Sequence, residues 1–450
     1  MDNDLTPHAN RVDLALPEHR GAEVLVVGLG FAGLTFSCLL ADSGLPTIGC
    51  DVNPDVVRCL AGGRPHLHET GVDTILAREL GGRLQVTTEV PCPLPPVVVV
   101  CVSTDFDRGE RRVNLAPLRS AVEAVARHLT PETLTIVRST VPVGTTRELV
   151  APLLRAKTAR PLLAFCPERT IQGQAMRELR QLPQIVGALD QASLARAEAF
   201  FRGLRISTVP VSSLEAAELA KLVNNAHTDL IYGFGNEVAL ISEALRLDAD
   251  EVIRAANLDY PRPDLSRPGF VGGGCLSKDP YLLIESCRAA GTFPAMVAAA
   301  RQLNETVPVH AGRRVLRQLE ELGRPAPDRR VLLAGLAYKG QPETDDLRGS
   351  PVYPVLEVLR GQAGALLGHD PLVAPDRIAA LGLEPVALED GLRGADAVLF
   401  LNNHPVYRDL DVARLPALLR RPAVVFDAWG LFRERASALE EISYLVLGRG

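Results

Sequence analysis

The chain lacks the features that mark membrane proteins and nucleic-acid-binding proteins. Its 450 residues contain no apolar stretch of the ~18 residues or more that a membrane-spanning helix needs. Its net charge is −6, and no long basic run is present to bind phosphate backbones. We therefore expect neither a membrane nor a nucleic acid among its partners.

Paired cysteines and targeting signals are also missing. The eight cysteines form no C-x-x-C pair and show no metal-ligand spacing, so we predict no metal site. Scattered cysteines in a long chain are typical of reduced thiols, which favours a cytoplasmic protein. The first 21 residues are polar and lack the apolar core of a signal peptide, so we expect a disordered tail there.

Apolar strand-like runs alternate with helix-like runs between residues 22 and 211. This alternation predicts a mostly parallel sheet with helices on both faces. The predicted strands are Val97–Val102, Leu134–Arg138 and Leu162–Phe165, and the predicted helices between them are Leu115–Leu129 and Gly144–Leu154. Ligands of such sheets bind at the carboxyl ends of the strands.

The pattern changes after residue 211. A helical region is expected over residues 212–322, beginning with a long spine helix that runs to about Leu245. Gly323–Asp328 is rich in proline and glycine and predicts a linker. A second α/β domain, residues 329–450, follows it. The predicted fold class is α/β, with two Rossmann-like doubly wound domains joined by a central helical dimerisation region.

The strongest motif lies at the start of the first domain. An apolar strand runs directly into Gly28-x-Gly30-x-x-Gly33, and the next strand ends on Asp51. The first two glycines allow a tight turn and close approach to a pyrophosphate, and Gly33 allows close packing of helix and strand. Asp51 can accept hydrogen bonds from a ribose diol and would repel a 2′-phosphate. The motif predicts NAD as the cofactor, in preference to NADP.

Cys275 is a candidate nucleophile. It follows three glycines and precedes Lys278 and Asp279. Glycines let the backbone approach a ligand, and a nearby cation would lower the pKa of the thiol. Spacing alone leaves open an alternative in which Cys275 is a structural cysteine in a glycine-rich turn.

Further polar candidates lie on the spine helix and beyond strand ends. Glu218, Lys221 and Asn225 share one helical face, which predicts a polar site facing a cavity or, alternatively, a solvated stripe. Glu168 follows one strand of the first domain and Thr140 follows another. Glu168 is either a general base or a salt-bridged surface acid.

The motifs together resemble those of the nucleotide-sugar 6-dehydrogenases, which act on UDP-glucose, UDP-N-acetylhexosamines or GDP-mannose. The resemblance covers about residues 22–435. Besides the glycine motif, it includes Arg138-Ser139-Thr140-Val141-Pro142, Cys166-Pro167-Glu168-Arg169, Glu218-Leu219-Ala220-Lys221, Gly272-Gly273-Gly274-Cys275, Gly335-Leu336-Ala337-Tyr338-Lys339 and Asp345-Asp346-Leu347-Arg348.

This resemblance implies a four-electron oxidation of a sugar C6 alcohol to a uronic acid, through a thiohemiacetal and a thioester on Cys275. The implied catalytic residues are Cys275, Lys221, Asn225, Asp279, Glu168 and Thr140. The implied cofactor contacts are Gly28, Gly30, Phe31, Ala32, Gly33, Asp51, Ser103, Thr104, Ser139, Thr140 and Lys278. The implied substrate contacts are Glu168, Arg169, Lys221, Arg262, Gly272, Gly273, Lys339 and Arg348, with Arg262 reaching into the partner's site of a homodimer or a larger homo-oligomer.

The variant Pro167-Glu168-Arg169 resembles the UDP-N-acetylhexosamine branch, and Gln172 stands where the UDP-glucose branch has a second Glu. Phe270, before the glycines, departs from the family pattern, as does Asp105, which stands where the family has proline. Oxidation of UDP-glucose or GDP-mannose is an alternative. A two-electron dehydrogenase of the hydroxyacid type and a non-catalytic protein that binds NAD or a nucleotide sugar also stay open.

Overall fold

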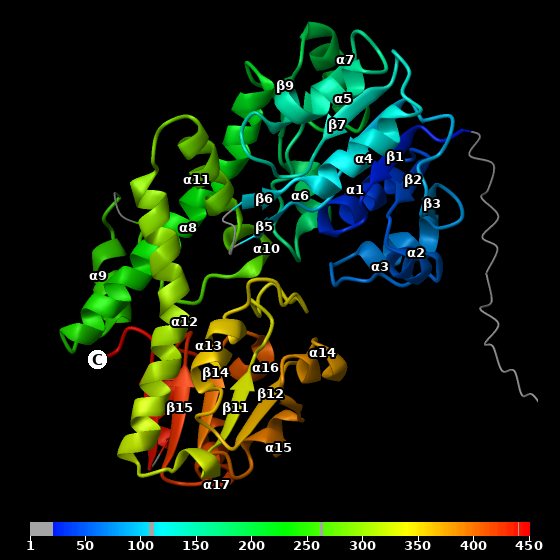
Figure 1. Cartoon of the computed structure of the whole chain (residues 1–450). Helices are drawn as coiled ribbons and strands as arrows, with labels where there is room; N and C mark the ends of the chain where they lie inside the picture. Colours follow the sequence, from blue (N-terminus) through cyan, green and yellow to red (C-terminus); the bar gives the residue numbers. More distant parts are fainter. Residues whose placement is uncertain (1–20, 108–111, 262–263, 440) are drawn as a thin grey trace, which may run out of the picture.

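The computed structural model describes residues 21–107, 112–261, 264–439 and 441–450. Two sheet-containing parts lie on one side of a set of long helices (Figure 1). The predicted tail, except Gly21, and the predicted substrate contact Arg262 lie outside the described residues. Within the described ranges, no helix combines the length and the apolar character needed to cross a membrane.

The first part is built on an eight-stranded sheet. Its strand order is β10-β9-β8-β7-β4-β1-β2-β3, and the neighbours pair in parallel except for β8 and β9. The strands are β1 (Val24–Val27), β2 (Thr47–Cys50), β3 (Leu84–Thr87), β4 (Val97–Val100), β7 (Leu134–Val137), β8 (Leu162–Phe165), β9 (Gln184–Ala188) and β10 (Thr208–Pro210). Strands β1, β4 and β7 are buried throughout, as expected for continuous apolar runs covered by helices on both faces.

Helices and one hairpin complete the first part. The helices are α1 (Phe31–Asp42), α2 (Pro54–Ala61), α3 (Val72–Glu79), α4 (Ala116–Ala126), the π-helix η1 (Thr146–Val150), α5 (Ala151–Arg155), α6 (Ala175–Gln181) and α7 (Gln191–Gly203). The hairpin pairs β5 (Asp105–Asp107) with β6 (Arg112–Asn114). The helix predicted over 144–154 therefore begins with a widened π turn, which sequence periodicity did not reveal.

The central region contains the long helix that the sequence predicted. Helix α8 (Leu214–Ala244) has 31 residues, and the Ser213 side chain caps its first turn by accepting from the Ala216 N–H. The other helices are α9 (Ala249–Asn257), α10 (Gly273–Leu276), α11 (Asp279–Ala289) and α12 (Ala295–Glu321). Helix α12 packs along α8 and continues to the second sheet, so it connects the two halves (Figure 1).

The last part is a six-stranded, fully parallel sheet in the order β13-β12-β11-β14-β15-β16. The strands are β11 (Arg330–Ala334), β12 (Ala365–His369), β13 (Glu384–Pro385), β14 (Ala397–Phe400), β15 (Ala423–Asp427) and β16 (Ile442–Val446). The helices are η2 (Ala326–Asp328), α13 (Val352–Leu359), α14 (Pro375–Ala380), α15 (Leu388–Leu392), α16 (Pro405–Arg408), η3 (Val412–Arg414), α17 (Leu415–Leu418) and η4 (Arg433–Ala438).

The first turns of the two sheets have the same construction. Gly28 and Gly335 both have a left-handed φ, at +90° and +86°, immediately after the first strand of each sheet. The next residue in each case donates its N–H to an aspartate beyond the second strand, Leu29 to Asp51 at 2.7 Å and Leu336 to Asp370 at 2.8 Å. The structure thus confirms the predicted α/β architecture with two related doubly wound units.

Candidate active site

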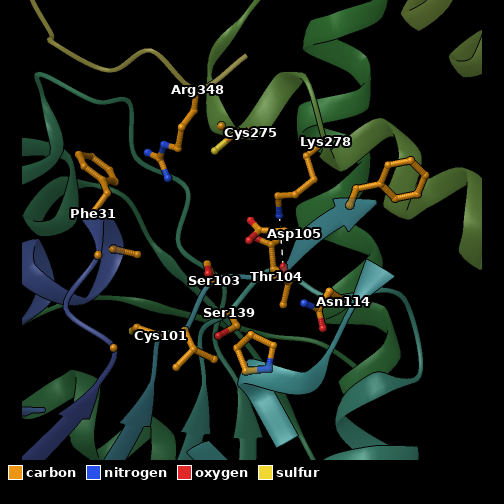
Figure 2. A pocket seen from close by; sticks show the side chains of 18 of the residues that line it. Phe31, Cys101, Ser103, Thr104, Asp105, Asn114, Ser139, Cys275, Lys278 and Arg348 are labelled. Carbon is orange, nitrogen blue, oxygen red and sulfur yellow. Dashed lines mark hydrogen bonds between the residues drawn. The ribbon is translucent and has the colours of Figure 1, made fainter. Parts of the chain in front are cut away.

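One cavity of about 1580 Å³ connects the glycine turn after β1 with Cys275 (Figure 2). All three parts of the chain contribute to its wall. Of the predicted site residues, the wall includes Gly28, Gly30, Phe31, Ala32, Asp51, Ser103, Thr104, Ser139, Thr140, Glu168, Lys221, Cys275, Lys278 and Arg348. The fold therefore brings most of the sequence-predicted residues to a single space.

The turn after β1 forms a cradle that fits a dinucleotide. A Cβ atom at Gly33 would lie 1.7 Å from the Gly28 carbonyl oxygen, so only glycine permits this contact of turn and helix. A Cβ at Gly30 would meet nothing within 4 Å, so this residue leaves open space in front of the turn. Helix α1 starts there without a side-chain cap, which leaves its first N–H groups available to an anion.

Asp51 lies at the other wall of this cradle, after β2. Its carboxylate accepts the Leu29 N–H at 2.7 Å and the Asn53 N–H at 2.9 Å. A carboxylate has about four acceptor positions, so two stay available to a ribose diol. The cradle, the helix terminus and this acid fit the adenosine diphosphate half of NAD.

The hydroxyl groups beyond β4 and β7 lie further along the same cavity. The Thr104 hydroxyl donates to the Thr140 carbonyl oxygen, and the Lys278 ammonium donates to the Thr104 oxygen at 3.2 Å. Lys278 also pairs with Asp279 at 3.2 Å. These contacts connect the loops of the first sheet to the residues that follow Cys275, although proline is absent after Thr104.

Lys221 is a buried cation beside the sheet loops. Its ammonium lies 3.8 Å from a Glu168 carboxylate oxygen, and both residues are at most 8% exposed. Burial alone would lower the pKa of Lys221, but Glu168, Cys275 and Asp279 outweigh it and raise the pKa. Asn225, one helical turn further, donates to the Asp279 carboxylate at 2.5 Å. Lys221 is therefore charged, and the nearby carboxylates of Glu168 and Asp279 balance its charge.

The Cys275 side chain is exposed to the cavity, whereas its pKa is raised rather than lowered. Burial by the surrounding protein is the largest cause, and the negative charges of Asp279 and Glu168 add to it. Lys221 and Lys278 act in the opposite direction, as the sequence predicted. The predicted effect of a cation on the thiol pKa is thus present, but burial and the carboxylates exceed it and the net shift of the pKa is upward.

Glu218 does not face the cavity with the rest of its helical stripe. Its carboxylate accepts the N–H groups of Gly144 at 2.6 Å and Thr146 at 2.8 Å. Burial raises its pKa to about 7, against the effect of these hydrogen bonds. Glu218 thus fastens α8 to the π turn that follows β7. Of the predicted stripe, Lys221 lines the cavity, and Asn225 joins the site through its hydrogen bond to Asp279.

Several predicted substrate contacts lie outside the cavity wall. The Arg169 guanidinium donates to the Pro183 carbonyl oxygen, and the Lys339 ammonium donates to the Gln172 carbonyl oxygen. Gly272 and Gly273 are buried beneath Tyr338. Phe270 is 5% exposed and belongs to a core shared with the second sheet, so its bulk points away from the cavity.

The sequence did not identify the support behind the cysteine loop. Arg301 of α12 is buried and donates to the Leu276 carbonyl oxygen and to the Asp229 carboxylate, each at 2.7 Å. Asn304 also donates to Asp229, at 2.9 Å. The signal that the sequence offered was the position of Asp229, Arg301 and Asn304 on otherwise buried faces of α8 and α12. Arg301 and Asn304 also line the cavity, so this network fixes the end of α10 at the cavity wall.

The site combines a dinucleotide cradle with a cavity to which all three parts of the chain contribute. A second doubly wound sheet completes the arrangement, which is typical of a dehydrogenase. The chain belongs to the UDP-glucose/GDP-mannose dehydrogenase family. The NAD binding domain of that family matches residues 22–205, its central domain 215–306, and its UDP binding domain 332–434. It is thus a nucleotide-sugar dehydrogenase with NAD as cofactor.

Individual relatives match over nearly their whole length. An NDP-N-acetyl-D-galactosaminuronic acid dehydrogenase of Ralstonia nicotianae is 30% identical, with 92% of this chain and 97% of the relative covered. The structure of a UDP-D-ManNAc dehydrogenase from Pyrococcus horikoshii has a TM-score of 0.86 at 29% identity, covering 95% and 99%. That of a UDP-glucose dehydrogenase from Pyrobaculum islandicum has a TM-score of 0.81 at 26% identity, covering 99% and 100%.

The charges around Cys275 predict how alkylation of the thiol depends on pH. Because the pKa is raised from the ordinary 9.0, the iodoacetamide rate at Cys275 should keep increasing above pH 9. Asp279→Asn should shift this profile to lower pH, and Lys221→Met to higher pH. Mass spectrometry of the Cys275 peptide measures the rate, with the exposed Cys92 as internal standard. A profile that does not move in either variant would contradict the charge assignment.

The position of Asp51 predicts the choice between NAD and NADP. A 2′-phosphate would face this carboxylate, so NAD should be preferred at least about tenfold, or about 1.4 kcal/mol. Asp51→Asn should reduce the ratio of kcat/KM with NAD to kcat/KM with NADP. Equal turnover of the wild type with both cofactors would show that Asp51 does not contact the ribose.

Proposed function

We propose that the chain oxidises the C6 alcohol of a UDP-N-acetylhexosamine to the uronic acid, in two NAD-dependent steps with a covalent intermediate on Cys275. The position of Cys275 in the same cavity as the dinucleotide cradle carries this proposal. Bound NAD would supply the hydride acceptor in each step. The product would serve as a precursor for a cell-surface polysaccharide, in the cytoplasm.

In the first oxidation, the C6 hydroxyl would lose its proton to water while hydride leaves the carbon for the bound cofactor. Lys221 is buried and charged, so its ammonium would stabilise the oxygen as negative charge develops there. Asn225 shares this role, and its bond to Asp279 fixes the amide orientation. Thr140 would support the nicotinamide end of the cofactor or a water molecule.

Cys275 would then add to the aldehyde. The sulfur–carbon bond forms as the thiol proton leaves and the carbonyl oxygen gains a proton, which gives a thiohemiacetal. Loss of its hydroxyl proton and of a second hydride, to a second NAD, would give the thioester. The raised pKa of the free thiol means that a base must take the thiol proton. Asp279 and Glu168 are the carboxylates whose charge the thiol senses, and they support such a transfer.

Hydrolysis of the thioester would release the acid and regenerate the thiol. Glu168 lies beyond β8 and lines the cavity beside Lys221, which supports its assignment as the base for water. Its second oxygen accepts the Thr170 N–H, so the carboxylate is held in place. Asp279 would help to position the water molecule.

The three parts of the chain would divide the binding between them. Residues 22–211 would bind NAD, 212–322 would form the dimer, and 329–450 would bind the nucleotide. Arg348, from the C-terminal part of the chain, lines the cavity and would contact the nucleotide sugar. Arg169, Lys339, Gly272 and Gly273 would act through the surrounding loops, since their contacts lie outside the cavity wall.

The N-acetylhexosamine assignment is supported by the activities named for the relatives from Pyrococcus and Ralstonia and by the sequence around Glu168. Oxidation of UDP-glucose stays as the alternative, because a UDP-glucose dehydrogenase has a similar fold. The NADH yield per sugar separates the classes. Two NADH indicate the four-electron enzyme, one indicates a two-electron dehydrogenase, and none indicates a binding protein.

A serine at position 275 tests the covalent step. Cys275→Ser should reduce acid formation by at least about 10³-fold, while NAD affinity stays unchanged because the cradle lies in another part of the chain. Coupled NADH detection with mass spectrometry of the sugar measures this loss, and Cys92→Ser is the matched control outside the cavity. Wild-type acid formation by Cys275→Ser would exclude the thioester mechanism.

The exposed apolar residues of the central helices predict a dimer. Val223, Phe234, Ile241 and Leu258 are between 42% and 73% exposed, on α8 and beside α9. We expect at least a dimer at micromolar concentration by light scattering. Phe234→Glu should shift the chain towards monomer, whereas Val406→Glu, an exposed apolar position of α16, should not. A monomeric wild type would contradict this assignment and the role of Arg262.

A further inference from the structure

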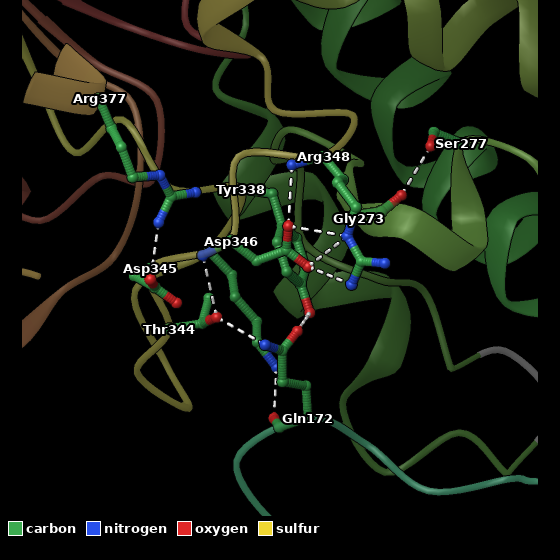
Figure 3. Close-up of polar contacts among 10 residues, drawn as sticks. Gln172, Gly273, Ser277, Tyr338, Thr344, Asp345, Asp346, Arg348 and Arg377 are labelled. Carbon is green, nitrogen blue, oxygen red and sulfur yellow. Dashed lines mark hydrogen bonds and ion pairs between the residues drawn. The ribbon is translucent and has the colours of Figure 1, made fainter. Parts of the chain in front are cut away.

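Gln172 connects the first domain to the last through three polar groups (Figure 3). Its side-chain amide donates to the Thr344 hydroxyl at 2.8 Å, and its side-chain oxygen accepts the Tyr338 hydroxyl at 3.3 Å. Its main-chain carbonyl accepts the Lys339 ammonium at 2.6 Å. All three partners lie in the segment between β11 and α13, and Thr344 is only 2% exposed.

The loop that carries Gln172 is also fixed from its other side. The buried Glu69 carboxylate accepts the N–H groups of Gly173 at 2.5 Å and Ala175 at 2.8 Å. Gly173 has a φ of +92°, and a Cβ there would lie 2.3 Å from Pro342 of the C-terminal domain. The two domains are therefore in direct contact at this loop, and the loop has little freedom to move away.

The segment that Gln172 holds covers the loop of the nucleophile. A Cβ at Gly273 would lie 2.8 Å from the Tyr338 ring, and a Cβ at Gly272 would lie 2.4 Å from the Gly349 carbonyl oxygen. Arg348 is at the same contact, since a Cβ at Gly274 would lie 3.1 Å from its guanidinium carbon. The Asp346 carboxylate holds this guanidinium at 2.7 and 3.0 Å.

We propose that Gln172 is a positioning residue that clasps the 338–349 segment against the Cys275 loop. The proposal rests on the proposed function, because it concerns how the nucleotide-sugar side of the cavity meets the nucleophile. Gln172 follows Glu168 by four residues in the same loop. The clasp therefore connects the cavity wall that carries Glu168, the proposed base, to the cavity wall that carries Arg348. It contacts neither NAD nor the reacting atoms.

The clasp acts on the side of the cavity that the nucleotide sugar would occupy. Without it, Tyr338 loses its bond to Gln172 and Thr344 keeps only the Asp346 N–H, so the C-terminal segment can move away from the glycines. Part of the binding free energy of the nucleotide sugar would then be used to close the domains, so its apparent affinity would fall. The dinucleotide cradle lies wholly in the first domain, so NAD binding is independent of this closure.

The test compares two glutamines of the same loop. Gln172→Leu removes both side-chain hydrogen bonds. Gln174→Leu is the matched control, because the Gln174 side chain accepts a hydrogen bond from Arg177 of the helix that follows it. We expect Gln172→Leu to raise the KM for the nucleotide sugar by about tenfold, with a smaller change in kcat and an unchanged Kd for NAD. Gln172→Glu keeps acceptors for both hydroxyl groups and should restore the KM. Tyr338→Phe removes one of the two side-chain hydrogen bonds and should raise the KM by a smaller factor. This variant replaces Gln172→Leu in the test if Gln172→Leu does not fold.

A second measurement needs no turnover. Iodoacetamide should alkylate Cys275 faster in Gln172→Leu than in the wild type, with Cys92 as internal standard, because the cover over the glycine loop is loosened. A lower melting temperature with unchanged KM and unchanged alkylation would overturn the proposal, as would equal effects of Gln174→Leu. If the wild type oxidises no nucleotide sugar, the proposed function fails, and the alkylation measurement alone decides the clasp.

Discussion

The buried ammonium of Lys221 is the interaction on which the rest of the site depends. An isolated charge in a protein interior is very costly, so Lys221 must be accompanied by carboxylates. Glu168 comes from the loop after β8, and Asp279 comes from the first turn of α11. Removing one partner of such a group typically costs about 3–5 kcal/mol, because the other charge stays buried. The requirement to compensate one cation thus sets the mutual position of α8, the sheet loops and α11.

The two doubly wound units use the same turn, but their aspartates differ in what they can still bind. Asp370 accepts four main-chain N–H groups, those of Leu336, Ala337, Leu372 and Val373. These fill the acceptor positions of a carboxylate, so Asp370 is a structural group. Asp51 accepts two, which leaves room for a ligand. The difference explains why the first unit matches an NAD binding domain although both share a topology.

Much of the fold could be predicted from the sequence, because each unit has strong local signals. The periodic apolar pattern predicted a long helix that runs to about Leu245, and α8 ends at Ala244 after 31 residues. The glycine turn and Asp51 predicted the cradle because their spacing is fixed by the backbone. The π turn at Thr146 was missed, since a single widened turn does not change the apolar periodicity.

The site was predicted less completely, because its contacts join segments far apart in the chain. Gln172 and Tyr338 are 166 residues apart, and no local pattern pairs them. Arg301 was overlooked for the same reason, as its partner Asp229 is 72 residues away. The net upward shift of the Cys275 pKa was missed for a different reason. Sequence showed the cations beside Cys275, whereas burial and the carboxylate of Glu168 follow only from the packed structure.

Charges of both signs lie near Cys275, and their opposition has a chemical consequence. Asp279 and Glu168 raise the pKa of the thiol, while Lys221 and Lys278 lower it. Because the charges oppose one another, burial decides the outcome, and Cys275 stays a thiol at neutral pH. A thiol is a far weaker nucleophile than a thiolate, so the free site is protected from side reactions. Protonation of either carboxylate would shift the balance towards the cations. Transfer of the thiol proton to a carboxylate would therefore stabilise the thiolate it creates, and the same residues can both restrain the nucleophile and release it.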